Sequence, residues 1–78
     1  MSARATLEFI VPYLVEHPDD VQIEEEESGR TLIFDLIVHP DDVGMVIGRS
    51  GRIARALRTV VKTAAAQEDR NALIEIVD

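Results

Sequence analysis

The chain contains no cysteine, and this absence excludes several classes of protein. Disulfide-stapled scaffolds, zinc sites built on thiolates and catalysis by a thiol all require that residue. The sequence therefore carries no sign of an oxidising compartment. No apolar run approaches the roughly 20 residues that a membrane-spanning helix needs. Near the start, Glu8, Pro12 and Glu16 interrupt the apolar residues, which argues against a signal peptide. We expect a cytoplasmic protein with no membrane contact.

Groups suited to catalysis are also scarce. The 78 residues suffice for one small domain, residues 1–78, but not for a core plus an enclosed catalytic cavity. His17 and His39 lie in proline-flanked turns, and no serine has a base nearby in the sequence. The four glutamates at 24–27 cannot converge on one ion, because consecutive residues of a strand point to opposite faces. They are typical of a charged edge strand. We expect no enzyme, no cofactor and no metal site.

The charge is unevenly distributed. A net charge of −7 argues at first against a nucleic-acid partner. Residues 1–42 hold eleven acidic and two basic residues, whereas residues 43–67 hold no acid. The bases of this second segment are Arg49, Arg52, Arg55, Arg58 and Lys62. Such an island can attract phosphate over about 8 Å at physiological salt, whatever the total charge. On charge alone, a solvated helix face with a chance excess of arginine is a slightly better explanation.

Hydrophobic periodicity predicts the order helix, strand, strand, helix, helix, strand. The first helix covers residues 4–16, where Pro12 predicts a kink or a late start. Strands at 21–28 and 30–38 form a hairpin around Ser28-Gly29. A short helix opens at Pro40 and ends at Gly48, a longer one runs to about residue 67, and a strand covers 72–77.

The apolar faces of these elements predict the core. In the first helix the face consists of Leu7, Ile10, Val11 and Leu14. In the second strand it consists of Leu32, Phe34, Leu36 and Val38, with Ile33, Asp35 and Ile37 on the other face. In the short helix it consists of Val43, Val46 and Ile47. In the long helix it consists of Ile53, Leu57, Val60 and Ala64, opposite Arg52, Arg55, Arg58 and Lys62. Asp41 and Asp42 are interpreted as acids of a first helical turn.

The turn between the last two helices is the most informative segment. Gly48 and Gly51 stand three apart, and without side chains they let a ligand backbone approach closely. Free N–H groups at the start of the long helix attract anions. Arg49, Arg52 and Arg55 supply charge, and Ser50 can cap the helix or reach a phosphate. A bare G-x-x-G is more often a helix cap followed by a turn. Here Val46-Ile47 precedes the two glycines, and an arginine and a branched apolar residue follow them. This extended motif is more specific than the bare G-x-x-G.

The stretch resembles the KH domain, whose signature is Ile-Gly-x-x-Gly-x-x-Ile. Ile47, Gly48 and Gly51 match, and Ile53 or Ala54 stands at or near the last position. The whole chain is similar to the small single-KH bacterial proteins of the KhpA type. The resemblance implies an α+β fold of type II, α-β-β-α-α-β, with a three-stranded sheet and three helices on one face. It also implies a groove that clamps about four nucleotides of single-stranded RNA.

For function, the resemblance implies an RNA chaperone or post-transcriptional regulator. It implies action with a second KH protein of the Jag type (KhpB) in cell-wall and cell-length control. The expected RNA-binding residues are Val46, Ile47, Gly48, Arg49, Ser50, Gly51, Arg52 and Arg55. Val46 and Ile47 are expected to contribute to an apolar groove floor. The three aromatic residues all lie outside the basic segment, so no aromatic side chain there can stack on a base. This predicts modest affinity for RNA.

Two alternatives remain open from the sequence, a helix–turn–helix DNA-binding domain and an adaptor that binds only protein. A four-nucleotide footprint is small, so we expect two domains to act on one RNA, in a homodimer or with the Jag-type partner. Candidate contact surfaces are Ile33 and Ile37 on the sheet, or Phe9 and Tyr13 on the first helix. That these residues complete the domain's own core is an equal alternative.

Overall fold

The computed structural model describes residues 1–77 and has an α+β fold, so that Asp78, the last residue of the predicted domain, lies outside the described part. The main elements are α1 (Ala3–Leu14), β1 (Gln22–Ser28), β2 (Thr31–Ile37), α2 (Val43–Ile47), α3 (Arg52–Ala66) and β3 (Asn71–Ile76). Single 3-10 turns occupy Pro18–Asp20, Pro40–Asp42 and Arg49–Gly51. The predicted order of helices and strands is confirmed. In residues 1–77 no helix is long and apolar enough to cross a membrane.

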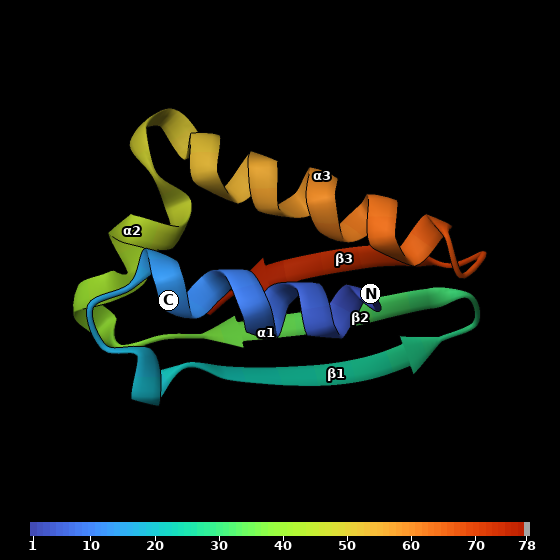
Figure 1. The fold of residues 1–78 in the computed structure, drawn as a ribbon, viewed down its shortest axis with the longest axis horizontal. Helices are drawn as coiled ribbons and strands as arrows, with labels where there is room; N and C mark the ends of the chain where they lie inside the picture. Colours follow the sequence, from blue (N-terminus) through green and yellow to red (C-terminus); the bar gives the residue numbers. More distant parts are fainter. Residues whose placement is uncertain (78) are drawn as a thin grey trace.

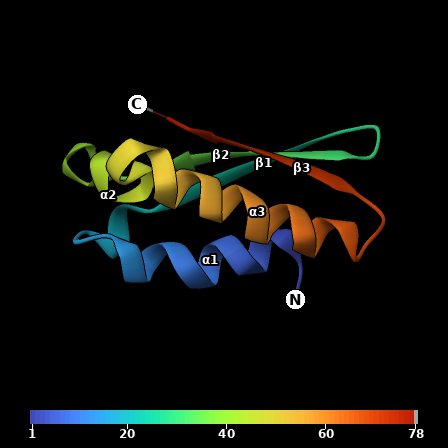
Figure 2. The same ribbon diagram turned by 90° about the horizontal axis from the view of Figure 1, so that it is seen from above.

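The sheet has the strand order β1-β2-β3. The hairpin pair β1–β2 is antiparallel and aligns Glu24 with Asp35, while β2–β3 is parallel and aligns Phe34 with Ile74. A parallel pair needs a long crossover connection, which α2 and α3 provide. The helices α1 and α3 lie side by side on one side of the sheet, and α2 contacts α1, α3 and β3 (Figures 1 and 2). The turn between α2 and α3 projects from one end of this layer (Figure 1).

The first helix begins earlier than the late start that we expected from Pro12. Ser2 caps it by accepting a hydrogen bond from the Ala5 N–H at 3.0 Å, and the helix runs from Ala3 through Pro12 to Leu14. The expected late start is therefore wrong. Proline lacks an N–H and removes one hydrogen bond to the preceding turn, but only two residues of helix follow it. Burial of Leu7 and Val11 against the sheet outweighs that local loss.

The strand β2 carries the centre of the core. Its side chains alternate between buried and half-buried, as predicted, and Phe34 and Leu36 are fully buried. They pack with Leu7 of α1 and Val61 of α3 in one hydrophobic cluster. The opposite face of the sheet carries no helix (Figure 2). There the carboxylates of Glu24, Asp35 and Glu75 stand in register across the three strands.

Two predicted core positions are wrong. Val60 is 44% exposed and Ile47 is 37% exposed. The buried face of α3 consists of Ala54, Leu57, Val61, Ala64 and Ala65. Alanines allow α3 to approach the sheet closely, so its contact line shifts from Val60 toward Val61. Of the predicted set in α2, only Val46 is fully buried.

Candidate nucleic-acid interface

The turn between α2 and α3 is built on a glycine that no other residue can replace without movement. Gly48 has a φ of +75°, and a Cβ added to it would lie 2.3 Å from Cγ1 and 2.9 Å from the backbone nitrogen of Ile53. Gly51 also has a φ of +75°, but a Cβ there would meet open space. Gly48 is therefore required by packing and conformation, and Gly51 by conformation alone. Ser50 adopts a left-handed conformation, with a φ of 56°.

The backbone N–H groups of the turn divide into two sets. Gly48 donates to the Gly44 carbonyl at 2.9 Å, Gly51 donates to Gly48 at 3.1 Å, and Arg52 donates to Arg49. The N–H groups of Gly51 and Arg52 are therefore engaged within the turn. In contrast, the adjacent N–H groups of Arg49 and Ser50 donate to no other residue among those that the structure describes. The two free donors stand next to each other on an exposed turn, which suits a phosphate oxygen.

Ser50 is exposed and does not cap α3, which has no side-chain cap. Of its two expected roles, only contact with a ligand is left.

The basic side chains around the turn are exposed and available. Within residues 1–77, Arg49, Arg52 and Arg55 form no ion pair. The three arginines outside the turn and α3 are engaged, Arg4 with Glu8 and Glu25, Arg30 with Asp69 at 3.0 Å, and Arg70 with Glu27. Free cations beside free N–H groups on a glycine turn form a positive patch within an acidic protein.

The apolar residues before the turn differ in their exposure. Ile47 and its neighbour Met45 present surface, at 37% and 38% exposed. Val46 is fully buried and supports the turn from beneath, so it offers no surface to a base. At the last position of the motif, Ala54 is buried, whereas Ile53 is half-buried and contacts Gly48. Ile53 thus provides the branched side chain one residue early.

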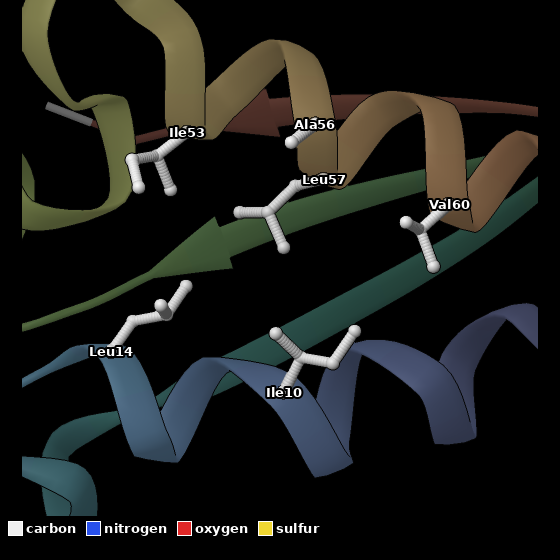
Figure 3. Close-up of a pocket in the computed structure, with 6 residues that line it drawn as sticks. All are labelled: Ile10, Leu14, Ile53, Ala56, Leu57 and Val60. Carbon is white, nitrogen blue, oxygen red and sulfur yellow. The ribbon is translucent and has the colours of Figure 1, made fainter.

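An apolar groove lies between α1 and the flank of α3 that faces it. Ile10 and Leu14 of α1 point toward α3 across an open space of about 170 Å³ (Figure 3). The opposite wall consists of Ile53, Ala56, Leu57 and Val60. Phe9 and Tyr13, whose ring centroids lie 5.6 Å apart, are 60% and 81% exposed on α1. They do not complete the core of this chain.

The start of α2 is held by a buried carboxylate that sequence reasoning missed. Asp42 is fully buried and accepts hydrogen bonds from the backbone N–H groups of Glu16 at 3.3 Å and His17 at 2.9 Å. The sequence pattern identifies Asp42 only as an acid of a first helical turn, and neither its burial nor its histidine partner follows from that pattern. The partner, His17, lies 25 residues away in the chain, beyond the reach of any helical or turn spacing.

Comparison with known proteins agrees with this architecture. The family model described as the KH domain of KhpA/KhpB matches residues 4–76. The chain belongs to this KH-domain family. A protein of Halalkalibacterium halodurans named "RNA-binding protein KhpA" is 47% identical over 75 residues, which cover 96% of this chain and 99% of the relative. The KhpA of Clostridium acetobutylicum is 46% identical, covering 91% of this chain and 95% of the relative. No solved structure gave a significant match.

The KhpA/KhpB family assignment confirms the resemblance seen in the G-x-x-G segment. It favours the KH fold over a helix–turn–helix domain, since the three-stranded sheet carries the core and is not an appendage. The names of the relatives describe RNA-binding proteins rather than enzymes, which agrees with the expectation that the chain is not an enzyme.

Proposed function

We propose that residues 1–78 act as one KH domain that binds single-stranded RNA at the turn 48–51. The observation that carries the proposal is the pair of free N–H groups at Arg49 and Ser50, on a turn whose glycine leaves no room for a side chain. These donors suit one phosphate group of the RNA backbone. The curated relatives of the chain are named as RNA-binding proteins, which supports the same ligand class.

The residues around the turn take separate roles in this proposal. Gly48 and Gly51 let the sugar–phosphate backbone approach, and the Ser50 hydroxyl can add a hydrogen bond. Arg49, Arg52 and Arg55 neutralise consecutive phosphates. Ile47 presents apolar surface to a base, while Val46 holds the turn from below.

The affinity is expected to be modest. Phe34 is fully buried in the core, and Phe9 and Tyr13 lie on α1, so neither the turn nor the helices α2 and α3 that flank it contain an aromatic residue. Aromatic stacking would otherwise contribute about 1–3 kcal/mol per base. With three phosphate contacts, the slope of log K against log salt concentration is expected near −2, from about −0.7 per contact on a single strand.

A small footprint favours action in pairs, because joining two domains on one RNA raises the effective concentration of the second. We propose as partners a second copy of this chain and the Jag-type KH protein KhpB, whose name the family model shares. In such a unit the protein would act in the cytoplasm as an RNA chaperone or post-transcriptional regulator, with effects on cell-wall synthesis and cell length. Cell-length measurement after depletion of the protein tests the cellular role, and sequencing of RNA crosslinked to the protein in undepleted cells identifies its targets.

Of the two candidate contact surfaces, the structure favours the α1–α3 side. Phe9 and Tyr13 are exposed next to an open apolar groove, which a protein partner can fill. Ile33 and Ile37 are half-buried, and the carboxylates of Asp35 and its neighbours on the adjacent strands stand among them. Burial of that row against a neutral surface would be costly.

The test is replacement of Arg49 and Ser50 by Asp. Both side chains are exposed, so folding, measured by circular dichroism, should not change. Binding to an unstructured single-stranded RNA should be abolished, because two carboxylates would face the phosphate. Wild-type protein that prefers duplex DNA in a gel shift would support the helix–turn–helix alternative instead. Retained partner binding with no RNA binding by the wild-type protein would support the adaptor.

A further inference from the structure

The basic side chains extend along α3 beyond the turn that the RNA proposal uses. Arg58 and Lys62 follow Arg52 and Arg55 at spacings that keep all four on one flank of the helix. All four are exposed, and in the described part of the chain none forms an ion pair. The helix contains no acidic residue. Arg58 and Lys62 therefore form a second cationic site whose charges no acidic side chain of the described residues neutralises.

This second site lies in line with the turn. At a rise of about 1.5 Å per residue, Lys62 lies about 15 Å along the helix axis from Arg52. Phosphates on one strand of a duplex are spaced about 3.4 Å along its axis, and an extended single strand spaces them more widely. The flank thus has room for roughly two phosphates beyond those at the turn. The apolar groove occupies the α1-facing flank with Val60 and Ala56, so this strand would not obstruct it.

Charge elsewhere on the molecule restricts the path of a strand. Toward the start of α2, a strand would meet the exposed carboxylate of Asp41. On the open face of the sheet, it would meet the row formed by Glu24, Asp35 and Glu75. Both directions are repulsive to phosphate, whereas the flank of α3 carries only positive charge.

We propose that Arg58 and Lys62 form a phosphate-binding subsite that extends the RNA path along α3, so that the strand leaves the turn 48–51 along this flank. The inference rests on the proposed RNA binding and adds the direction of the strand and a longer footprint. It predicts that a strand longer than four nucleotides makes about two additional phosphate contacts. The variants R58Q and K62Q, combined in one chain, should remove those contacts and leave the turn intact.

The experiment compares fluorescently labelled tetrauridylate and octauridylate, which have little structure of their own. For the wild-type protein, the salt slope should steepen from near −2 on tetrauridylate to near −3.5 on octauridylate, at about −0.7 per phosphate. The R58Q/K62Q protein should give a slope near −2 on both and bind octauridylate about tenfold more weakly at low salt. Its affinity for tetrauridylate should change less than twofold. Extra binding registers on the longer RNA raise affinity without changing the slope.

The matched control is the double variant R30Q/R70Q, which removes the same total charge from two arginines that are already ion-paired. It should leave both slopes unchanged. Equal slopes for the wild-type protein on the two RNAs would overturn the subsite, as would an equal loss in the two double variants. Failure of the underlying RNA proposal gives a different result, because the wild-type protein would then not bind tetrauridylate at all.

Discussion

Nδ1 of His17 lies 3.1 Å from Oδ2 of Asp42, although 25 residues separate the two in the chain. The same carboxylate accepts hydrogen bonds from the backbone N–H groups of Glu16 and His17, just after α1 ends. Asp42 precedes α2, and the other end of α2 carries the turn 48–51. A single buried side chain thus joins the end of the first helix to the segment that positions the candidate RNA site.

Replacement of Asp42 by Ala should destabilise the fold. It leaves the backbone N–H groups of Glu16 and His17 without their acceptor in a part-buried position. Loss of these bonds should lower the melting temperature by roughly 5–15 °C, measured by circular dichroism. The matched control is Asp20→Ala, at the corresponding position of the exposed turn Pro18–Asp20, which should change it by less than about 2 °C. Equal effects of the two substitutions would contradict the anchoring role.

The same carboxylate predicts a pH dependence of stability. Burial acts to raise the pKa of Asp42, but the hydrogen bonds from the N–H groups of His17 and Glu16, and from the His17 ring, outweigh it and lower the pKa below its ordinary value of 3.8. The stabilisation is therefore fully present above the unfolded-state pKa and is lost as the pH falls through the lower folded-state value. The difference in melting temperature between the wild-type protein and Asp42→Asn should shrink from pH 6 to pH 2.5. A difference that stays constant would show that ionisation of Asp42 contributes nothing.

The glycines around the turn should respond to alanine in a fixed order. Gly48→Ala should lower the free energy of unfolding by roughly 2–5 kcal/mol, because its Cβ overlaps Ile53 and its φ is positive. Gly51→Ala should cost roughly 1–2 kcal/mol, from the positive φ alone. Gly44→Ala, inside α2 with open space at its Cβ, should stabilise by roughly 0.5–1 kcal/mol. Urea unfolding measures all three changes in the free energy of unfolding. A loss for Gly48→Ala no larger than that for Gly51→Ala would contradict the packing of Gly48 against Ile53.

The apolar groove predicts association. Val60→Glu places a charge in the groove at a half-exposed position, so it should reduce self-association or binding to the Jag-type partner at least tenfold without unfolding the chain. Sedimentation velocity measures this. Ala66→Glu, exposed at the end of the same helix, carries the same charge outside the groove and should have no effect. A wild-type protein that stays monomeric at high concentration and does not bind the Jag-type partner would disprove the contact surface.

Much of the fold follows from local patterns. The alternation in β2 correctly predicted which side of the strand is buried, because the period of a strand is two whatever packs on it. The spacing of Gly48 and Gly51 identified the turn. The predicted buried face of α3 is confirmed at Leu57 and Ala64 but wrong at Val60, since the helical period does not say where the neighbouring sheet and α1 lie. Ala54, Ala64 and Ala65 belong to the buried face of α3, and Val60 lies outside it and is exposed.

The clearest division appears in a tetrapeptide that occurs twice. His-Pro-Asp-Asp stands at 17–20 and at 39–42, and each copy forms a single 3-10 turn that begins at its proline. The sequence alone determined these turns, because proline fixes its own φ and the hydrogen bonds are local. Yet Asp20 is exposed and Asp42 is fully buried, and the two histidine rings stack at 4.0 Å. Only the tertiary structure decided this difference, because burial depends on which distant N–H groups the folded chain brings to each carboxylate.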